Sequence, residues 1–243
     1  MVHGRGAPLA AGAQKEKELA RGVSLNWRPL KAFHSLPREW AEVTIDAALT
    51  PSADGFYLSF RLAGEGVAAC LPALSEHSMP IGGQRRDELW KQTCLEAFFG
   101  VRGQTAYYEF NASPEGDWAL YRFDGYRTQM TAVALSRPPE LLRQQWQFNS
   151  VDSAASKAST LLIEWWIPTF GAEALSDVSI TAVLAPWPRA PHSDLAAKPE
   201  RQLISYWALE HAGSVPDFHR RESFVIALDD AIAALSDAHP VHP

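Results

Sequence analysis

The chain has 243 residues, of which 47% are hydrophobic and 21% charged, and its formal net charge at pH 7 is −6. No apolar run approaches the roughly 18 residues that a membrane-spanning helix needs. The acidic balance, with a sequence pI of about 5.7, makes a phosphate backbone an unfavourable ligand. We therefore expect a soluble globular protein that has neither nucleic acid nor a membrane as its partner.

The first 23 residues lack the continuous apolar core of a secretory signal, and we expect a flexible leader there. Cys70 and Cys94 are the two cysteines of the chain, and their spacing fits neither a disulfide framework nor a metal or redox motif. A reduced, cytoplasmic location is the simplest interpretation. One disulfide between the two cysteines stays open, because a loop and a strand separate them in the sequence.

From about Ser24 onward, hydrophobic residues recur with period two. In the segment FYLSFRL at residues 56–62, the phenylalanines and leucines fall on one face, and the tyrosine, serine and arginine fall on the other. The same signal predicts strands over residues 43–49, 56–62, 93–101, 106–112, 118–123, 130–135, 146–151, 160–167, 178–184 and 203–209. Turn clusters divide these strands, which favours an all-β fold: an antiparallel, jelly-roll-like β-sandwich over residues 24–228.

Two segments depart from the strand pattern. The connection over residues 63–89, a long loop after the second strand, exceeds most loops in a compact domain, and we expect it beside the binding face. A short helix is predicted from Leu228 to Leu235, because Asp229 and Asp230 suit a first helical turn and the following residues favour helix. Residues 229–243 then form this helix and a frayed tail.

The segment over residues 85–127 combines aromatic rings with carboxylate and amide groups. If residues 90–98 are one extended run, Trp90 and Glu96 share a face, and Glu109 and Asn111 share a face on the next strand. Antiparallel pairing can then set Glu109 near Glu96. Rings stack on the apolar face of a sugar, while carboxylates and amides hydrogen-bond its hydroxyls. The alternative is that Trp90 belongs to the core and Glu96 pairs with an arginine.

The remaining polar residues do not form a recognisable catalytic or metal motif. Glu164 lies in an otherwise apolar strand, where we expect a structural salt bridge. The histidines are scattered, and the sequence has no HExxH, CxxC, GxSxG, P-loop or GxGxxG pattern. We therefore expect no metal, no cofactor and no enzymatic activity.

The segments RRDELWKQTCLEAF at 85–98 and YYEFNASP at 107–114, followed by Trp118, resemble the bacterial DOMON-like proteins related to type 9 carbohydrate-binding modules. IEWWIP at 163–168, SYWAL at 205–209 and PDFH at 216–219 extend the resemblance over residues 24–228. In the type 9 modules, two tryptophans sandwich a sugar and a nearby carboxylate bonds its hydroxyls. The resemblance implies that Trp90 is similar to the first ring, Glu96 to the carboxylate and Trp207 to the second ring.

The leading hypothesis is thus a non-catalytic domain that binds a small sugar or glycoconjugate, with a site formed by Trp90, Glu96, Glu109, Asn111 and Trp207. A protein-interaction module is an open alternative, since an aromatic patch also suits a partner protein. Haem or another redox ligand is a second alternative, because some DOMON relatives bind haem, and His77, Met79 and Met130 are available here. Glycoside cleavage by Glu96 and Glu109 is a third.

Overall fold

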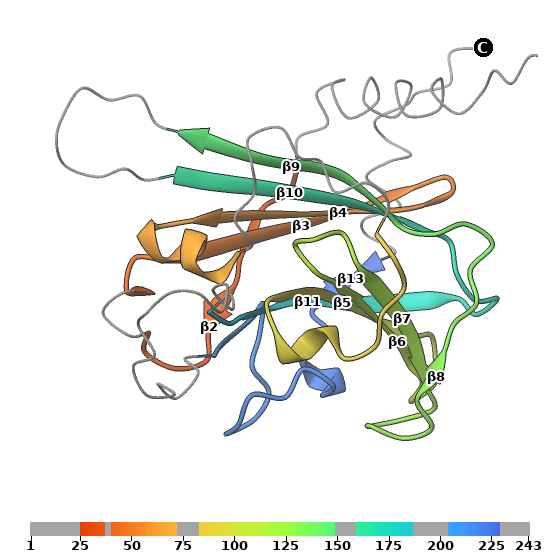
Figure 1. Cartoon of the computed structure of the whole chain (residues 1–243). Helices are drawn as coiled ribbons and strands as arrows, with labels where there is room; N and C mark the ends of the chain where they lie inside the picture. Colours follow the sequence, from red (N-terminus) through yellow and green to blue (C-terminus); the bar gives the residue numbers. More distant parts are fainter. Residues whose placement is uncertain (1–24, 37–39, 72–82, 149–158, 187–203, 229–243) are drawn as a thin grey trace, which may run out of the picture.

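Alternating hydrophobic residues place one face of the strands in a core shared by two stacked antiparallel sheets (Figure 1). The structure is a computed structural model that describes residues 25–36, 40–71, 83–148, 159–186 and 204–228. All strand pairings in these residues are antiparallel. The predicted all-β sandwich is therefore confirmed.

The smaller sheet has five strands, in the spatial order β1 (Arg28–Pro29), β3 (Thr44–Ser52), β4 (Gly55–Ala63), β10 (Ser159–Pro168) and β9 (Glu140–Phe148). The larger sheet has the order β2 (Lys31–Ala32), β12 (Ser205–Ala208), β11 (Leu175–Leu184), β5 (Cys94–Val101), β6 (Tyr107–Ala112), β7 (Trp118–Phe123) and β8 (Thr131–Ala132). A last short strand, β13 (Ile226–Ala227), also pairs with β11.

A tight turn joins β3 to β4 at the cluster that the sequence marks as a turn. Ser52 pairs with Gly55 across it. A Cβ atom at Gly55 would lie 2.1 Å from the carbonyl oxygen of Ile167, so a glycine is needed for β10 to approach this closely. The turn therefore fixes both the hairpin and the place of β10 beside β4.

The core between the sheets is built from one face of each strand. On β5 these residues are Leu95, Ala97, Phe99 and Val101, all at most 1% exposed. Phe110 of β6 meets Trp165 of β10 edge to face, with 5.8 Å between ring centroids. Burial of each such large side chain stabilises the fold by roughly 1.5 to 3 kcal/mol.

The larger sheet is buried on its outer face as well. A second hydrophobic cluster lies there and includes Phe98, Tyr107 and Phe224, together with other residues of β5 and residues of β7, β11 and β12. It is covered by turns rather than by a third sheet: the 3₁₀ turn η3 (Leu89–Lys91) and the chain after β12, which contains the 3₁₀ turn η4 (Arg221–Ser223) (Figure 1). A third such turn, η2 (Glu65–Cys70), follows β4.

Several predicted boundaries change. Trp90 lies in η3 and not in an extended run with β5, because Glu88 has a left-handed backbone with φ 64°. The strand predicted at 146–151 starts earlier, at Glu140, and the one predicted at 130–135 shortens to Thr131–Ala132. The helix predicted over residues 228–235 lies outside the described residues except for Leu228, and residues 1–24 lie outside them too. The last helical turn described is η4.

Two further sequence hypotheses are settled by the packing. Cys70 belongs to the core between the sheets and Cys94 to the cluster on the outer face, and both are free thiols. The open disulfide is therefore not formed. Glu164 is 3% exposed, and its Oε2 lies 3.0 Å from Nε of Arg143. The predicted structural salt bridge at Glu164 is confirmed.

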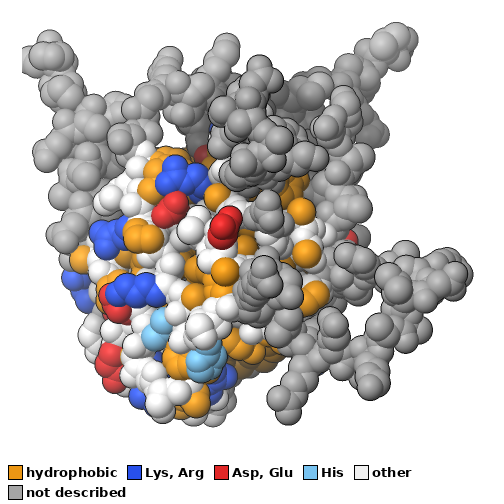
Figure 2. Space-filling model, turned by 90° about the vertical axis from the view of Figure 1, so that its left-hand side faces the viewer, with side chains coloured by type: hydrophobic (Ala, Val, Ile, Leu, Met, Phe, Trp, Pro, Cys, Tyr) orange, Lys and Arg blue, Asp and Glu red, His pale blue; other side chains and the backbone are white. Residues whose placement is uncertain are grey.

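The surface carries mixed charges. Figure 2 shows basic and acidic side chains interspersed with hydrophobic ones on the face that it presents. Among the described residues, the large hydrophobic side chains that are exposed are Tyr126, Met130, Val215 and Val225. None of the helices in the described part of the chain has the length and apolar character that crossing a membrane requires.

Candidate functional site

A cavity of about 460 Å³ opens on the outer face of the larger sheet. Its floor comes from the strands β5, β6 and β11, through Glu96, Phe98, Glu109 and Val183. Its walls come from Trp90, from Tyr206 of β12 and from residues 216–219, and Arg127 and Met130 stand at its rim. This volume lies within the range of roughly 300 to 1,000 Å³ that small-molecule pockets have.

Strand register brings the two floor glutamates together. Glu96 pairs with Asn111 of β6, and Phe98 pairs with Glu109, so Glu96 and Glu109 occupy diagonal positions on neighbouring strands. Side chains at such positions point to the same face of the sheet and are within reach of each other when they are long. The expectation that Glu109 lies near Glu96 is confirmed.

Glu96 is held in a nearly dry environment. Its side chain belongs to a residue only 2% exposed, and the hydroxyl of Thr181 on β11 donates to its Oε2 at 2.8 Å. Burial raises the pKa of Glu96 well above the ordinary value, and the nearby charge of Glu109 raises it further. The neutral acid is therefore the favoured form of Glu96 near neutral pH.

Glu109 is buried to a similar degree, at 4% exposed. The amide of Asn111 donates to its Oε1 at 2.7 Å, and Nε2 of His219 lies 3.8 Å from its Oε2. Burial raises the pKa of Glu109, although the Asn111 hydrogen bond and the charge of Arg127 act in the opposite direction. Burial thus raises the pKa values of both floor carboxyls.

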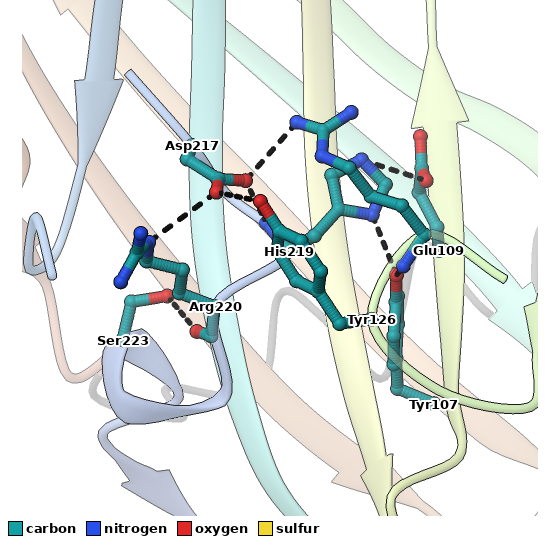
Figure 3. A network of polar contacts seen from close by, with 8 residues as sticks. Tyr107, Glu109, Tyr126, Asp217, His219, Arg220 and Ser223 are labelled. Carbon is teal, nitrogen blue, oxygen red and sulfur yellow. Dashed lines mark hydrogen bonds and ion pairs between the residues drawn. The ribbon is translucent and has the colours of Figure 1, made fainter. Parts of the chain in front are cut away.

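A hydrogen-bonded chain orients His219 toward Glu109 (Figure 3). The backbone N–H of Arg127 donates to the Tyr107 hydroxyl oxygen at 3.2 Å, and that hydroxyl lies 2.6 Å from Nδ1 of His219. Burial lowers the pKa of His219 to about 4, so its ring is neutral near neutral pH. The Tyr107 hydroxyl then donates to Nδ1, and the ring proton lies on Nε2, the nitrogen nearest Glu109.

Asp217 ties the rim of the cavity to its wall (Figure 3). It accepts hydrogen bonds from the Tyr126 hydroxyl at 2.6 Å, from Arg127 at 3.0 Å and from Arg220 at 3.3 Å. Although burial opposes it, the bonds from Tyr126 and Arg127 hold the pKa of Asp217 below its usual range. Asp217 is therefore ionised and balances the charge of Arg127.

The backbone of the rim is strained at the same place. Arg127 has φ 52°, in the left-handed region that non-glycine residues seldom adopt. Such a conformation costs on the order of 1 to 3 kcal/mol and clusters at functional sites. Here the contacts of Arg127 with Tyr107 and Asp217 hold it in place.

Aromatic rings form much of the wall. Trp90 packs edge-on to Tyr121, with 6.0 Å between centroids and 69° between planes. Tyr121 is in turn fixed by its hydroxyl, which donates to Asp87 at 2.6 Å. Phe218 meets Tyr206 edge-on at 6.1 Å. These contacts hold the rings of Trp90 and Tyr206 at the cavity, where both are only partly buried.

The structure brings three of the five predicted site residues to the cavity: Trp90, Glu96 and Glu109. Asn111 is fully buried and supports Glu109 through its amide. Trp207 is expected in the site as the second ring, but it does not line this cavity. Trp207 pairs with Ala182, faces the core between the sheets and donates from Nε1 to the Ser205 hydroxyl at 2.9 Å.

Tyr206 occupies the place that Trp207 was expected to take, because neighbouring residues of a strand point to opposite faces. Arg127, Phe218 and His219 also line the cavity; Arg127 ends the segment that the sequence marks for sugar binding, whereas Phe218 and His219 lie far from it. The segment PDFH at 216–219 contributes to the family resemblance. No periodicity or spacing in the sequence predicts that it lies near Glu109.

The residues considered for haem and the possible metal ligands do not form a site in the described part of the chain. His77 and Met79, considered for haem, lie outside the described residues, and Met130 stands 52% exposed at the rim. Within the described ranges, no group of three or more histidine, cysteine, aspartate or glutamate side chains is arranged to hold a metal ion.

No known protein family matches the sequence, and no curated protein matches it either. Among solved structures, the chain is similar to the crystal structure of a presumed carbohydrate-binding protein from Bacteroides uniformis, with 13% sequence identity and a TM-score of 0.50. The match covers 87% of this chain and 89% of the other. At this identity the likeness concerns the fold, which both chains share over most of their length.

Proposed function

We propose that this chain is a non-catalytic binding domain that holds a small carbohydrate or glycoconjugate in the cavity on the outer face of its larger sheet. One observation carries the proposal: a single cavity combines partly exposed aromatic rings with two buried carboxyl groups. Rings bind the apolar face of a pyranose, and carboxyls both donate to and accept from its hydroxyls.

The expected affinity is modest. Stacking on Trp90 and Tyr206 contributes on the order of 0.5 to 1.5 kcal/mol per ring beyond burial. Ordering of the ligand and loss of its water offset much of this gain. A dissociation constant between about 1 µM and about 1 mM is therefore expected, which corresponds to roughly 4 to 8 kcal/mol.

Two likenesses support the proposal. The similar structure from Bacteroides uniformis is presumed to bind carbohydrate. The sequence resembles DOMON-like proteins related to type 9 carbohydrate-binding modules, and two of the residues that carry this resemblance, Trp90 and Glu96, line the cavity. Tyr206 takes the part of the second ring in this proposal.

The electrostatics of the floor favour binding over glycoside cleavage. Glycosidases separate the pKa values of their two carboxyls, so that one is a protonated acid and the other an ionised nucleophile or base. Here burial raises the pKa of both Glu96 and Glu109. Because the pKa of Glu109 is raised to about 7, this carboxyl is only partly ionised at neutral pH, whereas a glycosidase keeps its nucleophile or base ionised.

The test is a calorimetric titration of the wild-type protein with a panel of mono- and disaccharides, nucleotide sugars and cell-wall fragments. Trp90→Ala is expected to weaken binding by about tenfold, the equivalent of roughly 1.4 kcal/mol of lost stacking and burial. Trp27→Ala is the matched control, because Trp27 lies against Arg61 of β4 in the smaller sheet. Its affinity should equal that of the wild type.

Thermal melting of both variants distinguishes a lost contact from a lost fold. The proposal stands if Trp90→Ala melts near the wild type and binds more weakly. It fails if no sugar in the panel binds, or if folded Trp90→Ala binds as tightly as the wild type.

A further inference from the structure

We infer that the sugar bound in this cavity carries a primary amine, whose ammonium group docks between the carboxylates of Glu96 and Glu109. This inference deepens the proposed function and depends on it. It names a cationic amino sugar, with a free amine, as the ligand class, in place of a neutral or anionic sugar.

The geometry of the floor is the first step. Both carboxyl groups belong to residues at least nine-tenths buried, and both reach the same cavity. The side-chain donors to the pair are neutral groups: the Thr181 hydroxyl and the Cys94 thiol to Glu96, and the Asn111 amide to Glu109. Within the described part of the chain, neither carboxyl has a lysine or arginine at ion-pair distance, and the nearest ring nitrogen of His219 is 3.8 Å from Glu109.

The other charged and titratable groups around the pair do not supply a counter-ion. They are Cys94 on β5, Tyr107 on β6, Tyr121 on β7, Arg127 at the rim, and Asp217 and His219 on the chain after β12. Burial keeps the thiol and both hydroxyls neutral by raising their pKa values, and it keeps the His219 ring neutral by lowering its pKa. Arg127 pairs with Asp217 at 3.0 Å, and Asp217 also pairs with Arg220 at 3.3 Å; the charge of Arg127 lowers the pKa of Glu109 without overcoming the effect of burial.

The floor therefore holds two acidic groups whose ionisation needs a cation from outside. A neutral sugar leaves the pKa values of both carboxyls raised, while an ammonium group stabilises their charged forms and offers three N–H donors. Binding of an ammonium thus releases protons from the floor. A sugar phosphate or uronic acid would bring a second anion to the same place, which is unfavourable.

The test is calorimetry at about pH 7 with glucosamine, glucose and N-acetylglucosamine, each in two buffers that differ in ionisation enthalpy. We expect glucosamine to bind at least about tenfold more tightly than the other two, and to release protons to the buffer. N-acetylglucosamine should resemble glucose, because acetylation removes the charge and keeps the ring. Equal affinities, or no proton release with glucosamine, would overturn the inference.

Isosteric variants locate the effect. Glu96→Gln is expected to abolish the preference for glucosamine and to reduce proton release, while glucose still binds. Glu164→Gln is the matched control, since Glu164 is a buried glutamate paired with Arg143 on the other sheet; it should keep the preference. Glu109→Gln provides a second test of the floor if Glu96→Gln does not fold.

The outcomes separate the two proposals. A folded Glu96→Gln that still prefers glucosamine overturns the amine inference. Binding of glucose without any preference for glucosamine overturns it too, and leaves the sugar site in place. Silence with all three sugars and the wider panel removes the proposed function itself.

Discussion

Gly100 on β5 has a neighbour that makes its missing side chain testable. The guanidinium of Arg221, in η4, lies over it, and a Cβ atom at Gly100 would be 2.0 Å from Nη2 and 2.1 Å from Cζ. From this position Nε of Arg221 donates to Asp177 at 2.8 Å and Nη1 donates to the carbonyl of Ala106 at 3.1 Å. Gly100 thus makes room for a clamp that joins η4 to β11 and to the start of β6.

Gly100→Ala is expected to displace this clamp. Hydrogen bonds that involve a charged group contribute roughly 1.5 to 3 kcal/mol each, and overpacking costs about 1 to 3 kcal/mol. Because the Arg221 side chain is one-third exposed, water restores part of the loss, and we expect the free energy of unfolding to fall by about 2 kcal/mol. For a chain of this size that corresponds to a drop in Tm of roughly 4 to 8 °C.

The assay is a double-mutant cycle measured by urea denaturation. In an Arg221→Ala background the guanidinium is absent and Oδ1 of Asp177, which would lie 2.4 Å from the added Cβ, is no longer held by the clamp and can move away, so Gly100→Ala should cost at least about 1 kcal/mol less than in the wild type. Gly103→Ala is the control: its Cβ would meet nothing within 4 Å, but its φ of 68° is unfavourable for alanine. That cost should be equal in both backgrounds. Full additivity of Gly100→Ala with Arg221→Ala would refute the reasoning.

Three further predictions concern the core, the floor and the wall. Trp207→Ala should lower the free energy of unfolding by about 3 to 5 kcal/mol in urea denaturation, since Trp207 is a core residue; a stable variant would place it elsewhere. Burial raises the pKa of Glu96 to about 8 from the ordinary 4.5. Between these two pH values the folded state binds more protons than the unfolded state, so the stability should fall as the pH rises. His219, with its pKa lowered from 6.5 to about 4, has the opposite effect on stability, but only below pH 6.5. Melting temperatures measured at successive pH values above 6.5 therefore report the carboxyls alone. If the melting temperature of Glu96→Gln fell with pH as steeply as that of the wild type, the reasoning would be contradicted. Tyr107→Phe should cost about 1 to 2 kcal/mol in urea denaturation, because His219 and the Arg127 N–H lose their partner; an unchanged midpoint would show that the bond is dispensable.

The architecture follows from local sequence patterns. Period-two alternation locates β4 and β7, and turn clusters separate the strands, since hydrogen bonding and side-chain direction in a strand are local properties. The segment CLEAFFGV of β5 carries further information. It is buried at every position, as its nearly continuous apolar composition indicates, and such a strand must be covered on both faces.

The site could be predicted only in part, and the errors have a common cause. Strand periodicity separates two faces but does not say which face points to the core. In β12 both candidates are aromatic, so hydrophobicity does not distinguish Tyr206 from Trp207, and only the pairing with Ala182 and Val183 of β11 decides. The proximity of Glu96 and Glu109 could be predicted because their strands are consecutive in the sequence and pair with each other.

The places that His219 and Arg127 take in the site could not be predicted from the sequence for a different reason. His219 contacts a residue 112 positions away, along a path over the sheet that tertiary packing determines. Arg127 owes its place to a left-handed backbone in the turn before β8, a conformation for which its residue type gives no signal.

The floor of the cavity belongs to strands, whereas its walls and rim come largely from turns and connections. Floor residues alternate along the chain with residues of the main core, so a change of strand register would disturb both. Wall and rim residues such as Pro216 and Met130 lie outside the strands, so they can change without a change of strand register. The ligand that the cavity accepts can therefore be altered by substitutions in these connections without a change in the sandwich or in its acidic floor.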